Sequence, residues 1–421
     1  MSQGQLERFD VEAYKNKKVL NSKYDLVKIG DIASLKAGGT PRRGIDDFWK
    51  NGTINWLKSG ELKDSLNITN IEEKITDEGL KKSSATLFEK GTLLIAMYGA
   101  TAGEVGILGI ESSTNQAVCS IIPKIEVNKN YLFWILFLLR KKIKSETFGG
   151  AQPNISKDYL ENLKIPLPPL EIQNQIVEKM DFALNEKKRK ESEAKTLLES
   201  IDDFVLTELG IEYKEVEEKK IFAISLNEVI EEFRFDPLNF QKKDKHIEKT
   251  KYKIGKLSEF ANVTKGQSIS SDNIIKGDIP VIAGGQTSPY NHNISNYNGN
   301  IITISASGAY SGYVWYHTYP IFASDCNVIF SKDEKILKTE FLSYFLKARQ
   351  KYIYSMQQGA GQPHVYSRDI EELEIPLPPL EIQEKIALEV KSKIEKANVL
   401  ESEAKEVYDK AKREVEEIIL D

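Results

Sequence analysis

Cysteine is scarce in this sequence, and long apolar runs are missing. Cys119 and Cys326 are the only two cysteines among 421 residues, and they do not stand at a metal-ligand spacing. A disulfide scaffold is thereby excluded, and we expect two buried thiols in a reducing cytoplasm. The longest apolar run, Tyr131–Leu139, is far short of the roughly 20 residues of a membrane span, so it predicts a buried helix. The opening MSQGQLERFD contains no basic stretch followed by an apolar one, which argues against a secretory signal.

Motifs of catalysis and nucleotide binding are also missing. The sequence contains no G-x-x-x-x-G-K-[ST] loop, no G-x-S-x-G elbow, no H-E-x-x-H helix and no paired C-x-x-C. Its four histidines, at 246, 292, 317 and 364, do not have the spacing of metal ligands. The Asn/Asp-Pro-Pro-aromatic motif of amino-methyltransferases is absent, and Asp236-Pro237-Leu238 is only a superficial echo of it. We therefore predict a non-catalytic chain with no catalytic residues and no metal site.

Acidic side chains outnumber basic ones, and their distribution matters more than the sum. The net charge is −5, whereas nucleic-acid-binding proteins usually carry an excess of Lys and Arg. Residues 24–165 contain 19 basic and 17 acidic side chains, and residues 251–374 contain 12 and 11. Residues 166–210 and 375–421 each carry a net charge of −4. Two slightly basic segments are thus compatible with DNA binding, although their charge does not require it.

An internal repeat organises the chain. Three patterns recur at a spacing of 210 or 209 residues: IPLPPLEIQ at 165–173 and 375–383, ESEAK at 191–195 and 401–405, and GA-x-x-G-x-V at 99–105 and 308–314. The copies differ in length in one region, because Gly60 and Gly99 are 39 residues apart whereas Gly285 and Gly308 are 23 apart. A duplicated unit that later diverged explains both observations.

Each repeat predicts a globular domain followed by a long helix. Short β-rich stretches alternate with Gly, Ser, Thr and Asn turns, so we expect an α+β class. The predicted fold has two similar domains joined by two long helices that form an antiparallel coiled coil with pseudo-two-fold symmetry. The expected boundaries are an N-terminal segment 1–23, a first domain 24–164, a central helix 165–210, a linker and lead-in 211–250, a second domain 251–374 and a distal helix 375–421.

The two helices have clear start, seam and stop signals. Pro168-Pro169 and Glu171 are typical of a helix start, which accounts for the P-x-x-P match better than a ligand for a proline-binding domain does. Gly210 is a suitable C-cap. A helix of roughly 39 residues would be about 58 Å long, enough to act as a spacer between two domains. Ten apolar residues at steps of three and four define the seams that these helices can bury against each other: Ile172, Ile176, Met180, Leu197, Ile201, Ile382, Ile386, Val390, Leu400 and Val407.

Taken together, these segments resemble the specificity subunits of type I restriction-modification enzymes. The resemblance covers nearly the whole chain and rests on the order of several motifs: GGTP at 38–41, INWLKSGEL at 54–62, GTLLIAMYGATAGEVGI at 91–107, TNQAV at 114–118, GGAQPNIS at 149–156 and the two IPLPPLEIQ segments. The second domain departs from the pattern, with IPVIAGGQ at 279–286 and SDCNV at 324–328. Its target should therefore differ from that of the first domain.

The resemblance implies a function as well as a fold. Each target-recognition domain would read one half of a bipartite site in double-stranded DNA. The helices that carry the ten seam residues would be partner-binding and would dock adenine methyltransferase (modification) subunits. Restriction or translocase subunits would join through the complex. S-adenosylmethionine, ATP and magnesium would bind only to those partner subunits, so this chain itself needs no cofactor. The complex would work in the cytoplasm.

Base edges are read by Arg, Lys, Asn, Gln and small hydroxyls on exposed loops, and these residue types define the candidates. Those of the first domain are Thr40, Arg42, Arg43, Lys58, Ser59, Tyr98, Thr101 and Asn154. Those of the second domain are Lys265, Gln267, Gln286, Tyr290, His292, Tyr310, Tyr313 and His364. Any one of them can instead be an ordinary solvated loop residue, and only the pairing of loops between the two copies favours recognition.

Two other interpretations remain open from the residues alone. A coiled-coil adaptor or scaffold that binds no DNA would show the same helices, and protection of a defined DNA site would exclude it. A nuclease using scattered carboxylates would require metal-dependent turnover by the purified chain.

Overall fold

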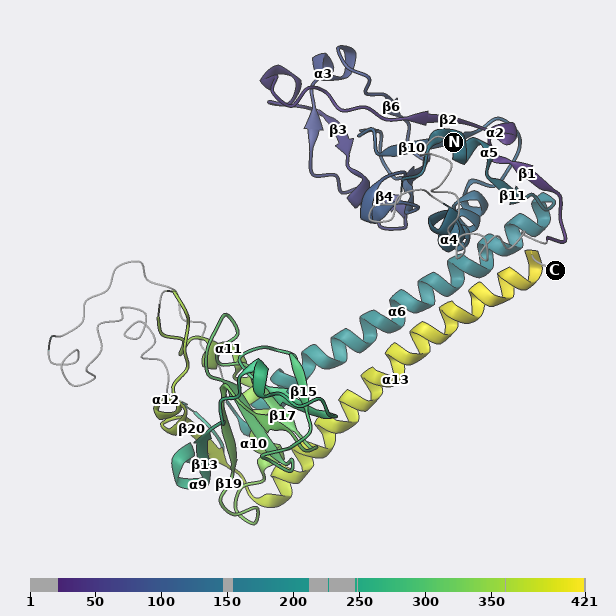
Figure 1. Ribbon diagram of the computed structural model, residues 1–421. Coiled ribbons are helices and arrows are strands. Elements are labelled where there is room, and N and C mark those ends of the chain that lie inside the picture. Colours follow the sequence, from purple (N-terminus) through teal and green to yellow (C-terminus); the bar gives the residue numbers. More distant parts are fainter. Residues whose placement is uncertain are drawn as a thin grey trace. The chain divides into compact units, whose positions relative to one another are not determined.

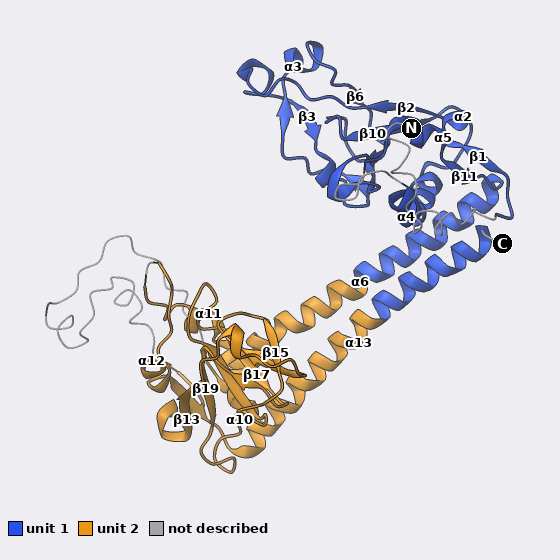
Figure 2. Cartoon of the chain, in the orientation of Figure 1, with its two compact units in different colours: residues 1–189, 403–421 blue, residues 190–402 orange. Residues whose placement is uncertain are grey.

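The structure, a computed structural model, describes residues 22–146, 154–211, 226, 247, 249–359 and 361–419. The chain forms two compact units, unit 1 with residues 1–189 and 403–421, and unit 2 with residues 190–402 (Figure 2). Each unit combines one α+β domain with part of both long helices, and each is described here by itself. Almost all of the predicted N-terminal segment and most of the predicted linker lie outside the described residues.

Two sheets build the domain of unit 1 (Figure 1). A five-stranded sheet has the order β2 (Ala33–Ala37), β10 (Val118–Pro123), β7 (Leu93–Ala96), β8 (Val105–Leu108) and β4 (Ser65–Ile68). A smaller sheet has the order β5 (Lys74–Ile75), β3 (Ile54–Leu57), β9 (Ser112–Thr114) and β6 (Leu87–Phe88). A separate antiparallel pair, β1 (Leu26–Lys28) and β11 (Lys164–Pro166), closes the domain next to the long helix.

The helices of this domain are α2 (Ile29–Ile32), α3 (Asp77–Lys81), α4 (Lys129–Glu146) and α5 (Lys157–Asn162), with 3-10 turns η2 (Asp46–Phe48), η3 (Ser59–Glu61) and η4 (Gly99–Thr101). Strand β7 is buried at all four positions because both of its faces are covered. Leu93 and Ile95 pack in a core with α4, whereas Leu94 and Ala96 point into a second core on the other face. The apolar run at 131–139 forms most of the buried face of α4, as predicted.

Unit 2 repeats this plan with fewer strands. Its four-stranded sheet has the order β13 (Ala261–Lys265), β19 (Cys326–Ser331), β16 (Ile301–Ser305) and β17 (Val314–His317). Its small sheet has the order β15 (Tyr290–His292), β14 (Ile279–Ile282) and β18 (Phe322–Ala323), and the closing pair is β12 (Lys253–Lys256) with β20 (Glu374–Leu377). The helical elements are α9 (Leu257–Phe260), η5 (Ser271–Asn273), α10 (Thr339–Ala348), α11 (Gln350–Tyr354) and α12 (Ser367–Glu371).

The strand pairing confirms the duplicated α+β domain. In both units the central pairs are antiparallel and occur in the same order, and β3 with β9 corresponds to β14 with β18 as the one parallel pair in each small sheet. The extra residues of the first copy form β4, α3 and β6, which all lie between Gly60 and Gly99. The region of divergence therefore adds secondary structure to the first domain.

The repeated nonapeptide has a structural role that its final glutamine explains. Gln173 donates a side-chain hydrogen bond to Pro168 O at 2.8 Å and accepts one from the amide of Asn128, just before α4, at 2.9 Å. Gln383 does the same with Pro378 O at 2.9 Å and the amide of Lys338 at 2.8 Å. Both glutamines are buried, so their hydrogen bonds tie the start of each long helix to its domain.

The long helices are α6 (Leu170–Leu209) and α13 (Leu380–Ile419). Within unit 1, the start of α6 packs against the end of α13, where Lys179 pairs with Glu414. Within unit 2, the start of α13 packs against the end of α6, where Lys385 Nζ lies 3.0 Å from a Glu208 carboxylate oxygen. The helices are therefore antiparallel in each unit, as predicted. Gly210 ends α6 with a φ of 67°, which confirms the predicted C-cap.

Candidate DNA-recognition surface

A tight turn meets the segment before α5 on the surface of unit 1. We call residues 98–105 the first turn segment, which contains η4. Tyr98 forms an isolated antiparallel bridge with Asn154, and both residues are exposed. The Thr101 side chain lies at the end of η4 and donates to Tyr98 O at 3.5 Å. The structure thus brings together three residues that the sequence singled out.

Unit 2 contains the equivalent arrangement. We call residues 307–314 the second turn segment. Ser307 bridges to His364 as Tyr98 does to Asn154, and the amide of Gly308 donates to Pro363 O at 3.0 Å. Tyr310 projects from this turn with 48% of its surface exposed. The predicted pairing of loops between the two copies is therefore seen in the backbone hydrogen bonds.

Two further candidates of unit 2 are Gln286 and Tyr313, and Tyr313 belongs to the second turn segment itself. The Gln286 side chain donates to the hydroxyl of Tyr354 at 3.4 Å. Tyr313 is half-buried, because Lys347 Nζ lies 4.0 Å from the centre of its ring. A half-buried tyrosine offers its hydroxyl edge to a ligand more readily than its face.

In the first domain, Thr40 lies close to the first turn segment. Its hydroxyl hydrogen-bonds the side chain of Gln116, and the neighbouring Ala117 carbonyl accepts the amide of Met97 at 2.7 Å. Arg42 has an exposed side chain, and its carbonyl accepts the indole N–H of Trp49 at 3.1 Å. Thr40 and Arg42 thus border the small sheet of this unit.

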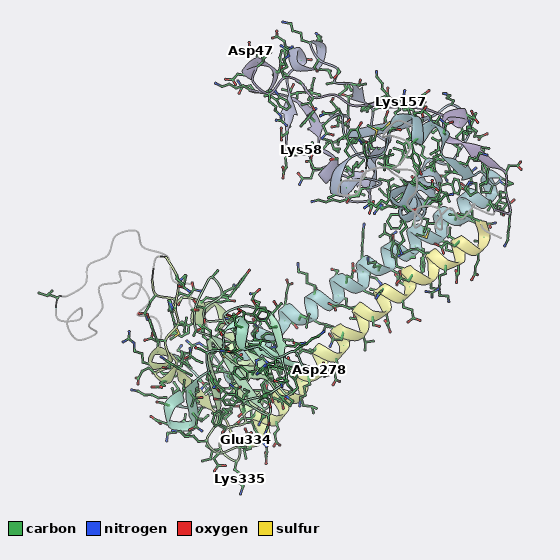
Figure 3. The ribbon with its side chains drawn as sticks, in the orientation of Figure 1. Asp47, Lys58, Lys157, Asp278, Glu334 and Lys335 are labelled. Atoms are coloured by element: carbon green, nitrogen blue, oxygen red, sulfur yellow. The ribbon has the colours of Figure 1, made fainter. Side chains whose placement is uncertain are left out.

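Arg43 and Lys58 already have acidic partners within the chain. Arg43 pairs with Glu73, and its guanidinium carbon lies 3.8 Å from the centre of the Trp49 ring. Lys58, which directly follows β3 (Figure 3), lies 3.1 Å from Glu73 and 3.1 Å from Glu72. Its hydrogen bonds with Glu72 and Glu73 raise the pKa of Lys58, and the hydrogen bond from Arg43 lowers the pKa of Glu73. Binding of phosphate by either cation would compete with these contacts.

The remaining candidates are placed in different surroundings. Ser59 is half-buried at the start of η3, and Lys265 is exposed at the end of β13. Tyr290 is 53% exposed on β15. These three residues do not form a cluster with the turn segments in any hydrogen bond of the described residues.

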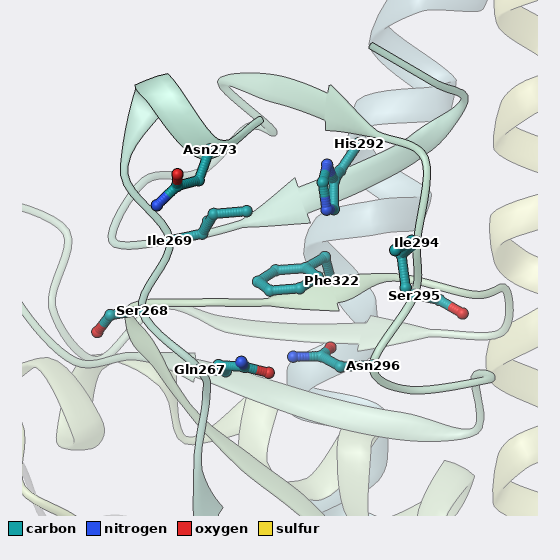
Figure 4. Close-up of a pocket in the computed structure, with 9 residues that line it drawn as sticks. All are labelled: Gln267, Ser268, Ile269, Asn273, His292, Ile294, Ser295, Asn296 and Phe322. Carbon is teal, nitrogen blue, oxygen red and sulfur yellow. The ribbon is translucent and has the colours of Figure 1, made fainter. Parts of the chain in front are cut away.

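The prediction that His292 lies on an exposed loop is wrong. His292 ends β15 with 5% of its surface exposed, and its Nδ1 lies 3.1 Å from the amide of Ile275. Its ring packs edge-on against Phe322, with 5.3 Å between ring centres. His292 and Phe322 line a cavity of about 440 Å³, at whose rim lies the predicted Gln267 (Figure 4). Strand pairing in the small sheet, which short-range sequence patterns do not reveal, turns this histidine inward.

Seam residues of the two long helices pack inside the chain, as the predicted antiparallel coiled coil requires. Ile176 and Met180 are fully buried in the core of unit 1, and Ile386 and Val390 are fully buried in the core of unit 2. Leu197 and Leu400 pack with Ala194 and Ala397 inside unit 2. A side chain that is fully buried within its own chain has no surface left for a partner. The half-buried seam residues stay candidates for partner binding: Ile172, Ile201, Ile382 and Val407.

The sequence did not single out three side chains that hold the turn segments. Asp64, Arg140 and Gln350 hydrogen-bond the backbone of these turns. Arg140 and Gln350 occupy equivalent positions 210 residues apart but differ in chemistry, so the repeat alone does not mark them. Asp64 lies in the region where the two copies diverge.

The chemistry of the two cysteines follows from their burial. Both are free and buried, as predicted. Burial raises the pKa of Cys119 to about 11 and that of Cys326 to about 12. Both thiols are thus protonated at neutral pH and are poor nucleophiles or metal ligands. Over the described ranges no cluster of three or more His, Cys, Asp or Glu side chains is arranged to hold a metal ion.

None of the helices in the described part of the chain is long and apolar enough to cross a membrane.

The fold and the paired turn surfaces define a class of protein with two similar recognition domains connected by long helices. The family model for the type I restriction modification DNA specificity domain matches residues 21–196 and again residues 249–406. The chain therefore belongs to this family, which confirms the resemblance seen in its motifs.

Known relatives agree with this assignment. The chain is 31% identical over 176 residues to the type I restriction enzyme MjaIX specificity subunit of Methanocaldococcus jannaschii, a match that spans 40% of each chain. It is 26% identical over 426 residues to the MjaVIII specificity subunit of the same organism, spanning 94% of this chain and 92% of the relative. Among solved structures, the type I system S subunit from M. genitalium is similar in fold, with a TM-score of 0.53, 16% identity and coverage of 96% and 98%.

Proposed function

We propose that this chain is the non-catalytic DNA-sequence specificity subunit of a type I restriction-modification complex. Each domain would read one half of a bipartite site in double-stranded DNA. The observation that carries this proposal is that the family model matches both copies of the repeat separately. Each copy also presents an exposed tyrosine on a turn that pairs with a polar residue just before a short closing helix.

The two turn surfaces would supply the base-reading contacts. Tyr98, Thr101 and Asn154 in the first domain offer hydroxyl and amide groups, which are the groups that read base edges in the major groove. Gln286, Tyr310 and His364 offer the corresponding groups in the second domain. Arg42 and Lys265 are exposed cations, so they would contact phosphates and fix the register.

Partner subunits would supply the chemistry. Adenine methyltransferase subunits would dock on the outward faces of α6 and α13, and restriction or translocase subunits would join through that complex. S-adenosylmethionine, ATP and magnesium would bind those partners in the cytoplasm.

The test is to co-express the chain with the methyltransferase expected beside it and to map methylated adenines in the host DNA by single-molecule sequencing. We expect a two-part motif with a fixed gap, present only when both chains are made. Co-purification without any motif would contradict the specificity role and favour an adaptor, and failure to associate would contradict the docking of methyltransferase on the helices.

A domain exchange separates the two halves of the proposed site. Replacing residues 253–373 with the same segment of another family member should change one half of the motif and leave the other half intact. Expression of the parent and the exchanged chain at equal levels provides the control. A change in both halves would contradict the assignment of one half-site to each domain.

A further inference from the structure

Each turn segment contains a glycine in the left-handed region, which L side chains rarely adopt. Gly103 in the first segment and Gly312 in the second have φ values of 79° and 92°. The amide of each glycine donates to a backbone carbonyl, that of Ala96 or of Ser305, whereas its own carbonyl accepts a hydrogen bond from a side chain. Different residues supply that side chain in the two units.

In unit 1 an ion pair holds the turn. Arg140, on α4, donates from Nε to Gly103 O at 2.8 Å. The carboxylate of Asp64 accepts the amide of Val105 at 3.2 Å. Arg140 and Asp64 also contact each other through two hydrogen bonds, one of them 2.8 Å long. The Arg140 and Asp64 side chains are only 20% and 27% exposed, so solvent screens this pair less than it screens a surface pair.

In unit 2 one neutral side chain makes both contacts. Gln350, at the start of α11, donates from Nε2 to Gly312 O at 2.7 Å. Its Oε1 accepts the amide of Val314 at 2.9 Å. Gly103 and Gly312 are equivalent in the repeat, as are Val105 and Val314. A single amide therefore replaces the donor and the acceptor that unit 1 divides between two charged residues.

Each turn has one cation beside it, which is Arg140 itself in unit 1 and Lys347 in unit 2, and these two positions differ by three residues in the repeat. In unit 2, Lys347 Nζ lies 3.3 Å from Val314 O and 3.3 Å from Gln350 Oε1. Its equivalent in unit 1 is Phe137, over which the guanidinium carbon of Arg140 lies at 5.0 Å. In each unit one of the two equivalent positions holds the cation and the other an uncharged side chain. The cation comes second in unit 1, after Phe137, and first in unit 2, before Gln350.

We infer that Arg140 with Asp64, and Gln350 alone, are positioning residues that set the specificity of the two half-sites by fixing the turn segments. We call these two groups the first clamp and the second clamp. This inference rests on the proposed function, because it concerns the same recognition surfaces. Discrimination between bases requires donors and acceptors held to within about 0.5 Å by supporting hydrogen bonds, and these side chains supply such bonds to the turn segments. Each clamp should affect only the half-site that its own domain reads.

The test uses the full chain co-expressed with its methyltransferase and measures methylation at every near-match of the motif. Arg140→Ala should raise methylation at sites with a wrong base in the first half by at least about fivefold, the lower end of the discrimination that one base contact provides. Methylation at sites with a wrong base in the second half should not change. Gln350→Ala should raise methylation at sites with a wrong base in the second half and leave methylation at sites with a wrong base in the first half unchanged. Lys141→Ala, an exposed neighbour on α4, is the matched control and should resemble the parent.

Rescue distinguishes positioning from general stability. The double variant Arg140→Gln with Asp64→Asn gives the first clamp the neutral chemistry of the second, and it should restore discrimination at the first half. Asn is chosen because residue 64 has a φ of 52°, a conformation that Asn tolerates. If Arg140→Ala fails to fold, Gln350→Ala decides the question on the second half.

Three results would overturn the inference. One is an unchanged motif in folded Arg140→Ala and Gln350→Ala. Another is equal relaxation of both halves by either variant, and the third is no recovery in the double variant. The absence of any motif with the parent chain would contradict the proposed function itself, so the two failures are distinguishable.

Discussion

One buried histidine should make the stability of unit 2 depend on pH. His317 ends β17 and is fully buried. Its Nε2 lies 2.8 Å from the hydroxyl of Thr303, whereas its Nδ1 is buried without a hydrogen-bond partner among the described residues. A protonated ring would carry two N–H donors and could satisfy only one. Burial accordingly lowers the pKa of His317 from 6.5 to about 4.

The sign and size of the effect follow from the two pKa values. Between pH 6.5 and pH 4 the unfolded chain binds a proton at His317 and the folded chain does not, so the folded state loses stability as the pH falls through this range. The loss through this residue between pH 7 and pH 5 is about 2 kcal/mol, from the difference of about 2.5 between the two pKa values. Below pH 4 this contribution no longer changes.

The assay is hydrogen exchange with mass spectrometry, in increasing denaturant, on peptides that cover β16 and β17. His317→Gln cannot take up the proton, so the stability of the parent relative to this variant should fall by about 2 kcal/mol from pH 7 to pH 5. Thr303→Val breaks the same hydrogen bond but leaves His317 able to titrate, and it should keep the pH dependence of the parent. If the parent and His317→Gln lose equal stability over this range, the reasoning is refuted.

Three further predictions concern packing, thiol chemistry and the start of α13. Ile386→Ala should lower the unfolding free energy of unit 2 by about 2–4 kcal/mol in denaturant melts, since the side chain is fully buried. Leu388→Ala, at a side chain 71% exposed on the same helix, should change it by less than about 0.5 kcal/mol. Similar losses in the two variants would contradict the burial of the seam. Cys119 and Cys326 should resist a thiol reagent at pH 8 until the protein is denatured, and rapid labelling of the native chain would contradict their burial and raised pKa. Gln383→Ala should cost about 1–3 kcal/mol in chemical denaturation, because it leaves buried polar groups unpaired, and a cost near zero would show that the repeated glutamine does not anchor α13.

Periodic and repeated features could be predicted from the sequence because they depend on local chemistry. The spacing of apolar residues predicted both long helices, and Gly210 predicted the end of α6, where a positive φ is needed. The 210-residue repeat predicted two similar domains, and the strand orders confirm it. The repeated GA-x-x-G-x-V pattern, at 99–105 and 308–314, indicated in the same way that the turns after Tyr98 and Ser307 are equivalent.

The surroundings of individual side chains could not be predicted, because they depend on contacts between distant segments. His292 was expected on a loop but is buried against Phe322, which lies 30 residues further along the chain on β18. Arg43 was selected as a DNA-binding candidate, and the sequence did not reveal that Glu73, just before β5, pairs with it. The apolar periodicity of the seam marked Ile176 as buried between the two helices, but it could not show that Ile176 also belongs to the core of the first domain.

By itself, the sequence determined the two long helices, the buried helix around residues 131–139, the duplication and the family that the motifs indicate. The reason is that backbone preference, hydrophobic period and repetition can all be recognised in consecutive residues. Only the tertiary structure decided that Arg140 and Asp64 in one domain make the two contacts that Gln350 makes in the other. The physical reason is that a backbone carbonyl and a backbone amide can be satisfied by any donor and acceptor that folding brings within about 3 Å. Different residues from different elements can therefore make the same two hydrogen bonds to a turn, and a comparison of the two sequence copies does not reveal that they are equivalent.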